Sequence, residues 1–512
     1  MRAIIRFGAL LSASLLVVAS GGVDAQVTTP APDASGRLFS IVPSLSISET
    51  LTDNSGLSSS NRQADLITQV SPGIHISSSG GRIKGFLDYS LTGVDYARTS
   101  SGNELQNSLN ALANIEAVEN WAFMDASANI SQQVTSAFGT RSADSSLING
   151  NRSEVRTLLL SPYVKGRLAG FADYEARVSQ TWSNNSTSEA ANNRTTQATL
   201  HVAGVTGLQV LSWSADASHL AYDYSVGPRT VDDTVSGIVY ITVDPQLRVS
   251  LIEGDESNNI LTAQRQSHST PGFGFDWSPT ERTKISAQLE RRFFGSSHLF
   301  SFEHRTPRTV WSYTDSQNIS TGFGQPVLGS LGTAYDLYFA QFASLQPDPA
   351  LRATLVNDFL AANGIAPTTQ LFAGSLAAAV TKQHLQQLSF ALLGIRDTVT
   401  FAASQSEASR LNSAVVVVDD FANGNLVRER GISISVAHRL TPSSSVSLVA
   451  SIDRISGTVG SPSTDLRSVN LYWTGQLSSR STLLVGARHS EFSSPSDPYT
   501  ENAVSATLGL RF

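Results

Sequence analysis

The sequence predicts an all-β fold: a transmembrane, antiparallel, up-and-down β-barrel of about 22 strands, in a range of about 18 to 24, with a small α-helical insertion. Three observations predict this fold. Apolar and polar residues alternate along many segments of about 10 to 15 residues, short turns alternate with long polar connections, and an export signal precedes them. The last segment, 504–512, is apolar at every second position and ends in Phe512. A terminal aromatic residue is typical of the closing strand of an outer-membrane barrel, and we expect it to act as the C-terminal assembly signal.

Residues 1–25 have the pattern of a secretory signal peptide. Arg2 and Arg6 precede an apolar run at 9–19, and Val23-Asp24-Ala25 fits a signal peptidase site. A single membrane anchor is the alternative, but the run is far shorter than the ~20 residues that a spanning helix needs. We therefore expect cleavage after Ala25 and delivery to the cell outer membrane of a Gram-negative bacterium.

The composition suits a barrel and excludes several other classes. Residues 26–36 read as a disordered lead-in, and 37–512 as the barrel domain. No later segment has the long apolar run of a spanning helix, and the chain has no cysteine for disulfides, thiolate metal sites or thiol nucleophiles. The net charge is −7, charged residues make up only 15% and no basic run is present, which argues against nucleic acid as a partner.

Individual segments show two distinct faces. In 83–92, Ile83, Leu87 and Leu91 alternate with polar residues that we assign to the lumen. Segments 122–131, 432–439 and 446–453 repeat this pattern. Four tryptophans lie near predicted strand ends or on outward positions and fit aromatic girdles at the membrane surfaces: Trp121, Trp182, Trp277 and Trp473.

The connections fall into two classes that alternate along the chain. Short ones such as 78–81 suit the periplasmic end, and long polar ones such as 135–152 suit the extracellular end. Soluble sandwiches and propellers give no reason for this sorting. An even strand count returns Phe512 to the periplasmic side. The count treats 298–319 as two strands joined at Thr306-Pro307; one long strand there would change the total.

The β pattern breaks at about 330–383, where the spacing becomes helical. Asp348 can cap a helix that starts at Pro349 and ends at Asn363-Gly364, and a further short helix is expected at 373–382. Lipid-exposed helices between barrel strands are not viable, so this insertion lies outside the membrane or inside the lumen. By strand parity it leaves the outer rim, either as a lid or partial plug or as an inert folded loop.

No convincing active site is present in the sequence. The nine histidines form no His-Glu-x-x-His motif, and no Gly-x-Ser-x-Gly elbow or phosphate-binding loop occurs. A hydrolase assembled from separate strands is the remaining enzymatic alternative. We expect a protein that is not an enzyme and has no cofactor, metal or catalytic residue.

Charged residues on the predicted inner face are the candidate lumen-lining set. They are mixed with hydroxyl and amide side chains, which suits a hydrated passage for a polar solute such as a sugar chain. The alternative is that these charges pair between neighbouring strands and brace the wall. The set comprises Glu116, Asp173, Glu175, Arg177, Glu290, Arg292, Arg439, Asp453, Arg488 and Arg511.

Three segments resemble those of the PEP-CTERM system-associated outer membrane protein family. They are 38–50 (LFSIVPSLSISET), 304–309 (HRTPRT) and 359–364 (FLAANG), and the resemblance extends over the mature chain in their order and in total length. It implies an exopolysaccharide-linked outer-membrane β-barrel found with exosortase-type sorting systems, paired with a periplasmic polysaccharide export protein. The family supplies no agreed functional residues.

These observations lead to three functional hypotheses. The first is a non-catalytic pore for exopolysaccharide export, whose partners are outer-membrane lipid, the barrel assembly machinery, a periplasmic polysaccharide export protein and the polysaccharide itself. The second is an anchor or assembly partner for surface protein sorting, with its pore closed by the insertion. The third is a general diffusion porin.

Overall fold

The computed structural model describes residues 39–186, 192–208, 210–225, 229–320, 334–342, 349–363, 380–411, 420–421, 426–458 and 463–512. The predicted signal peptide (1–25), the lead-in (26–36) and much of the predicted insertion lie outside the described residues. Within the described part of the chain, neither helix is long and apolar enough to span a membrane.

One antiparallel sheet closes on itself, because the first strand, β1 (Phe39–Thr52), pairs with both β2 (Asp65–Ser78) and β23 (Tyr499–Arg511). β12 (Gln266–Ser269) and β13 (Gly272–Thr280) lie end to end along β11 (Leu247–Asn258) and together occupy one position in the barrel wall. The 23 strands therefore form a 22-stranded barrel. The break falls at Thr270-Pro271, where proline lacks the N–H of a ladder hydrogen bond. The predicted barrel and strand number are confirmed.

The remaining strands follow one another around the wall, each paired with its neighbours in sequence. The 298–319 segment forms two strands, as predicted. The bounds are β3 (Ile83–Tyr96), β4 (Glu104–Val118), β5 (Ala122–Val134), β6 (Arg152–Leu168), β7 (Ala172–Asn185), β8 (Asn193–Val205), β9 (Leu211–Tyr224), β10 (Thr230–Asp244), β14 (Thr283–Arg292), β15 (Gly295–Arg305), β16 (Thr309–Ser320), β17 (Thr381–Leu393), β18 (Asp397–Arg410), β19 (Leu426–Thr441), β20 (Ser444–Ser456), β21 (Ser463–Ser478) and β22 (Ser481–Ser493), with a short 3₁₀ turn, η1 (Ser100–Gly102).

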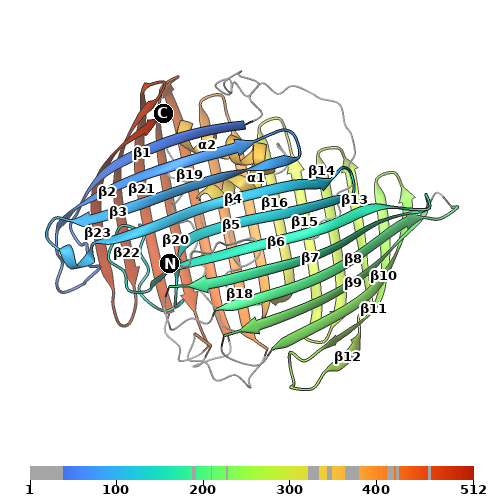
Figure 1. The fold of residues 1–512 in the computed structure, drawn as a ribbon. Coiled ribbons are helices and arrows are strands. Elements are labelled where there is room, and N and C mark those ends of the chain that lie inside the picture. The colour runs from blue at the N-terminus through green and yellow to red at the C-terminus, as the bar shows by residue number, and fades with distance from the viewer. Residues whose placement is uncertain are drawn as a thin grey trace.

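Figure 1 shows the strands of the wall side by side, with blue β1 next to red β23. Short turns such as 79–82, 306–308 and 442–443 lie at the end where β1 starts and β23 finishes. The longer connections lie at the opposite end, apart from the tight turn at 293–294 between β14 and β15. In outer-membrane barrels the short turns face the periplasm and the longer loops face the outside. We therefore call the short-turn end periplasmic and the opposite end extracellular.

The outer face is an apolar belt. Residues directly opposite each other in an antiparallel pair share a face, so the register assigns a side to every strand residue. Ile47, Leu200, Leu251 and Leu471 all lie on the outer face, with 39%, 46%, 59% and 48% of their surface exposed. Near the periplasmic turns the same face carries exposed tryptophans, which form an aromatic girdle: Trp121, Trp277, Trp311 and Trp473.

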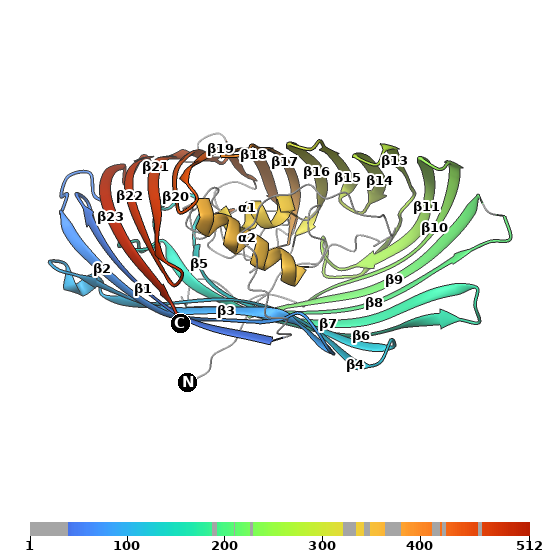
Figure 2. The ribbon, with the colours of Figure 1, turned by 90° about the horizontal axis from the view of Figure 1, so that it is seen from above.

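The buried apolar clusters lie inside the barrel. Two helices, α1 (Ala334–Gln341) and α2 (Pro349–Asn363), sit within the ring of strands when the barrel is seen from above (Figure 2). Pro349 begins α2 and Asn363 ends it, as predicted, while Asp348, Gly364 and 373–379 lie outside the described residues. Part of the predicted third helix is wrong, because β17 begins at Thr381 and pairs with β16.

Candidate functional site

The inner wall carries pairs of hydroxyl groups that bridge neighbouring strands. Ser161 and Ser179 are 2.7 Å apart between β6 and β7, and Ser286 and Ser301 are 2.7 Å apart between β14 and β15. Further pairs, 2.8 to 3.0 Å apart, are Ser48–Thr507, Ser71–Thr92, Thr157–Ser183 and Ser451–Ser468. A hydroxyl can donate and accept, so these groups satisfy one another and still offer sites to a polar solute.

The register places the ten candidate residues on the inner face of their strands. Arg511 is exposed at the periplasmic end, and Arg439 is half-buried. Glu116 accepts a hydrogen bond from the backbone N–H of Asn120 in the adjoining turn, at 2.6 Å. The register for the set is given by the pairings of β4, β7, β14, β19, β20, β22 and β23.

Three of the candidate arginines are held by carboxylates. Arg177 donates to Asp125 at 2.7 Å and to Glu175 at 2.9 Å, while its guanidinium lies over the ring of Tyr163. Arg488 makes two parallel hydrogen bonds to Glu501, at 3.0 and 2.8 Å. Two parallel bonds fix a guanidinium firmly, so these charges brace the wall.

Arg292 is the third candidate arginine that carboxylates hold. Its Nε donates to Glu256 at 3.1 Å, and its guanidinium also lies 3.6 Å from Asp232. Glu256 has no exposed surface. Elsewhere in the candidate set, Asp173 forms an exposed ion pair with Arg167 at 2.9 Å, and Glu290 accepts from Gln288 at 2.5 Å. Charged side chains of the inner wall are therefore paired with neighbouring groups of opposite charge, and the wall does not present a single sign of charge.

The connection between β5 and β6, residues 135–151, folds into the lumen, although the sequence predicts an ordinary extracellular loop. We call it the inner loop. Asn151 shapes it by donating to the carbonyl oxygens of Ser136, at 2.8 Å, and Thr140, at 3.1 Å. Its buried Leu147 packs with Ile67 of β2, Tyr96 of β3 and, across the seam between β23 and β1, Phe492 and Tyr499. No local sequence pattern signals this, because these partners are distant from the loop in the sequence.

Arg141 is the main anchor of the inner loop. Its side chain is 1% exposed and forms an ion pair with Asp453 of β20, whose side chain is 5% exposed. The guanidinium also donates to the Asp453 carbonyl at 3.1 Å, and Tyr499 donates its hydroxyl to the Arg141 carbonyl at 2.6 Å. Removing one partner of such a buried pair typically costs about 3–5 kcal/mol, because the other charge stays buried. Asp453, a predicted lumen residue, is thus a loop anchor.

A second ionic anchor involves Asp144. Its carboxylate pairs with Arg488 of β22, the guanidinium that Glu501 also holds. Burial raises the pKa of Asp144, but Arg488 and the hydrogen bonds from Ser146 outweigh this, so the pKa lies below its ordinary value. The inner loop is therefore held by two arginine–carboxylate pairs and by Asp420, which accepts from the Ser136 hydroxyl and the Ala137 N–H at 2.6 Å each.

The helices occupy another part of the lumen. Leu337, Tyr338 and Leu360 are buried together with Ala402 and Val449 of the inner wall. The Tyr338 hydroxyl donates to the Thr400 hydroxyl of β18 at 3.2 Å. These contacts fix the helices against the inner face of β18 and β20, so in the described structure they lie inside the lumen and not as a lid outside it. We call α1 and α2 the helical plug.

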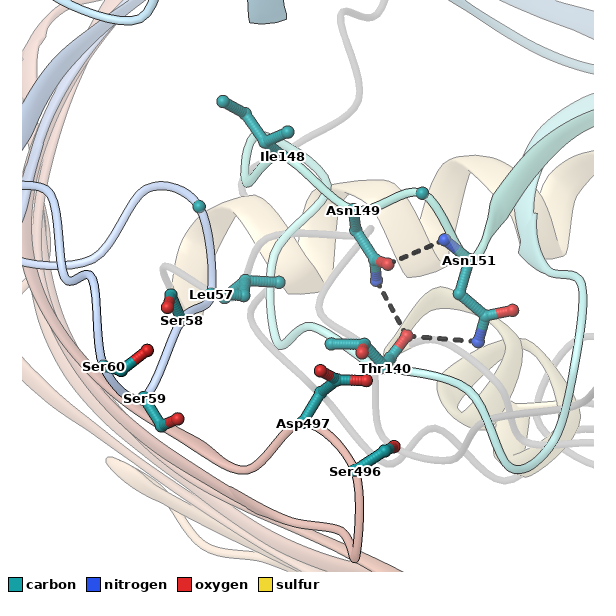
Figure 3. A pocket seen from close by; sticks show the side chains of 12 residues that line it. Leu57, Ser58, Ser59, Ser60, Thr140, Ile148, Asn149, Asn151, Ser496 and Asp497 are labelled. Carbon is teal, nitrogen blue, oxygen red and sulfur yellow. Dashed lines mark hydrogen bonds between the residues drawn. The ribbon is translucent and has the colours of Figure 1, made fainter.

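A polar pocket of about 470 Å³ opens at the extracellular mouth (Figure 3). Three connections build it: 56–60 after β1, the inner loop, and 496–497 before β23. Its lining offers hydroxyl and amide groups, with Asp497 as an acidic group and Leu57 and Ile148 as apolar ones. Asn149 and Asn151 are oriented by hydrogen bonds to each other and to Thr140. Such a lining suits a neutral, hydroxyl-rich ligand.

No protein-family model matches the chain, and a comparison with curated proteins finds no match either. Solved structures with similar folds include the siderophore receptor PirA from Pseudomonas aeruginosa (9% identity, 92% of this chain and 80% of that one, TM-score 0.45). The FrpB iron transporter from Neisseria meningitidis (F5-1 variant) has 10% identity, covers 92% and 82%, and has a TM-score of 0.49. PirA from Acinetobacter baumannii has 9% identity, covers 92% and 80%, and has a TM-score of 0.48.

Proposed function

We propose that this outer-membrane β-barrel is a plugged, non-catalytic passage through which an exopolysaccharide leaves the cell. The observation that carries the proposal is the inner wall, where paired hydroxyl groups alternate with arginines compensated by carboxylates. A neutral, hydroxyl-rich surface exchanges hydrogen bonds with a sugar chain without trapping it by charge. The resemblance to PEP-CTERM-associated proteins supports the same substrate class and remains a prediction.

The inner loop and the helices supply the closed state of this passage. A wide water-filled barrel would leak periplasmic contents, so a passage for a large polymer needs an obstruction that yields during transport. Arg141 and Asp144 hold one obstruction, and the buried contacts of Leu360 hold the other. We propose that a periplasmic polysaccharide export protein delivers the polymer to the short-turn end of the barrel.

Planar-bilayer recording tests the passage. We expect low conductance for the wild type and larger open steps when residues 330–379, which precede β17, are removed and Arg141 is replaced by alanine. Neutral dextran should block the opened current, whereas polyglutamate of equal length should not. An opened barrel that is blocked only by the polyanion would contradict the proposed substrate class.

Gene deletion tests the cellular role. Cells without the protein should lose surface polysaccharide, and the wild-type gene should restore it. Thr199 faces the lumen on β8, and its neighbour Leu200 faces outward. Replacing several inner residues around Thr199 by tryptophan should prevent rescue, whereas tryptophan at Leu200 should allow it. Unchanged surface polysaccharide in the deletion strain would exclude export.

A second candidate is an anchor or assembly partner for sorted surface proteins. It is favoured by the extent of the plug, because Val356 and Leu360 of α2 have no exposed surface. A barrel that stays closed after both obstructions are released would support this role. Free swelling of liposomes by small sugars with the wild-type protein would instead support a general diffusion porin.

A further inference from the structure

Three polar side chains gather on the outer, lipid-facing side of the wall: His298 of β15, Asp315 of β16 and His384 of β17. The register sets Gln317 of β16 opposite both histidines, so the two imidazoles flank the middle strand at one level. Asp315 lies two residues from Gln317 and therefore points to the same side. The same face of β16 carries Trp311, which is 40% exposed.

Both imidazoles converge on a single oxygen atom. The Nε2 atoms of His298 and His384 lie 3.0 and 2.8 Å from Oδ1 of Asp315. The other carboxylate oxygen, Oδ2, accepts hydrogen bonds from Gln386, at 3.0 Å, and from the Tyr313 hydroxyl, at 3.4 Å. The carboxylate is thus oriented from one side by two donors, while two ring nitrogens meet its opposite oxygen.

Other described His–Asp pairs are built differently. His75–Asp88, His201–Asp216, His219–Asp233 and His438–Asp397 each bring one imidazole to one carboxylate, and each does so through Nδ1. At Asp315 two imidazoles share one oxygen, and both use Nε2. Among these pairs, the Asp315 cluster alone brings two ring nitrogens and a carboxylate oxygen together at one point, as the ligands of a shared ion are arranged.

The position of this cluster on the lipid-facing side of the wall requires an explanation. Ionisable groups on the lipid face of a barrel are costly, most of all near the bilayer midplane. These three side chains remain 22% to 28% exposed. His298 and His384 lie close to the extracellular starts of their strands. A charged cluster here, near the headgroup layer, is less costly than at the midplane and can reach ions in the surrounding water.

We propose that His298, Asp315 and His384 bind one zinc ion. Two imidazole nitrogens and a carboxylate oxygen are a common zinc donor set, whereas magnesium and calcium prefer all-oxygen ligands. Ligand atoms about 2.0–2.2 Å from a tetrahedral zinc lie about 3.3 Å apart. The ligand atoms here are already within 4.8 Å of one another, so small side-chain rotations complete the site. Each imidazole then carries its proton on Nδ1 and offers the Nε2 lone pair.

The bound ion would join three adjacent strands at the extracellular rim. β16 and β17 are the strands between which the helical insertion leaves the wall. Zinc would therefore hold together the two strand ends that carry the plug. Three protein ligands leave one coordination position open to water or to a phosphate oxygen of an outer-leaflet lipid.

The test uses the full-length barrel, purified in detergent micelles and stripped of metal with a chelator. Titration with Zn²⁺ against a fluorescent zinc indicator should give one ion per barrel. His298→Ala and Asp315→Asn should each weaken binding by at least ~100-fold, and Gln386→Ala, which removes a supporting partner, by about 10-fold. His438→Ala is the matched control, since it removes an outward imidazole from a simple His–Asp pair, and it should bind Zn²⁺ as the wild type does.

Co²⁺ provides a second readout, which reports the coordination geometry and not the affinity. The cobalt-loaded wild type should show the intense visible bands of a four-coordinate site, and His384→Gln, which can still donate a hydrogen bond to Asp315, should lose them. Absence of stoichiometric Zn²⁺ binding by the wild type would overturn the proposal. Equal affinity in the wild type and in folded His298→Ala would overturn it as well, as would a cobalt spectrum without those bands.

Discussion

Arg141 and Asp453 form a buried ion pair inside the barrel, although 312 residues separate them in the sequence. The pair joins the inner loop, which leaves the wall between β5 and β6, to β20 on the other side of the seam where the barrel closes. It is one of three polar anchors that hold the inner loop in the lumen, together with the Asp144–Arg488 pair and the hydrogen bonds to Asp420.

Arg141→Ala should release the inner loop. The substitution leaves the Asp453 carboxylate buried without its partner, and we expect the loop to lose about 3–5 kcal/mol of attachment. Single-channel recording should show more frequent or larger openings. Arg454→Ala is the matched control: this neighbour of Asp453 faces outward, its side chain is 60% exposed, and its ion pair with Asp465 is 3.7 Å long. A surface pair of that kind contributes about 0–1 kcal/mol.

The double variant Arg141→Met with Asp453→Leu separates charge from packing. Replacing both members of a buried pair by apolar residues of similar volume is often neutral. We expect its thermal unfolding in detergent, followed by circular dichroism, to resemble the wild type more closely than either single variant does. If the double variant is as unstable as the sum of the two single ones, the pair does not act as a unit.

Acid should loosen the second anchor. Because the folded-state pKa of Asp144 lies below the unfolded value of about 3.9, its ionic contribution is present in full above that value and is lost as the pH falls through the folded pKa. Conductance should therefore be constant between about pH 7 and pH 5 and rise below about pH 4. Asp144→Asn should raise the conductance at neutral pH and reduce this acid dependence. A wild type that opens near pH 6 would point to another group.

Leu360→Ala should loosen the helical plug while leaving the wall intact. The side chain has no exposed surface, and truncation of a buried leucine costs about 2–5 kcal/mol. We expect faster proteolysis of 330–383 with an unchanged unfolding temperature of the barrel. Leu351→Ala, on the same helix at a position that is 45% exposed, should be cleaved at the wild-type rate. Equal cleavage of both variants would show that the helices are not held by this packing.

Val178→Arg tests which face meets lipid. Val178 is near the middle of β7, faces outward and is 51% exposed. Arginine near the bilayer midplane of a barrel costs about 2–4 kcal/mol on the lipid face. Thr181→Arg, three residues along the same strand and facing the lumen, should cost clearly less. Unfolding free energies measured in lipid vesicles decide between them, and a reversed order would mean that the faces are exchanged.

The wall could be predicted from the sequence because its rule is local. Alternation in segments such as 83–92 assigns each residue to a face without knowledge of its partners, and turns such as Thr306-Pro307 mark where strands reverse. The strand count and the inner-face assignment of Arg177 both follow from this. The strand break at Pro271 needed a partner strand to be recognised.

The contents of the lumen could not be predicted in this way. Arg141 stands in a polar stretch that resembles any extracellular loop, and its choice of Asp453 depends on the closed barrel. For the cluster on the outer face a signal did exist. His298 occupies a position that the alternation assigns to lipid, two residues before Phe300, so a polar residue in the apolar register was the available clue. His384 gave no such clue, because Lys382 and Gln386 flank it on the same face.

Closure of the ring has a consequence for biogenesis. β1 is the first strand to be made, and its partner β23 is the last, with the backbone N–H of Phe512 donating to the Pro43 carbonyl at 3.0 Å. Until that seam forms, two strand edges stay open, and such long-range pairing is slow. Asp453 and Arg488 also belong to the last strands of the sheet, so the ionic anchors of the inner loop come from the same end of the chain as the closing strand. A chain truncated before β20 would therefore lack both the seam and the two groups that hold the inner loop in the lumen.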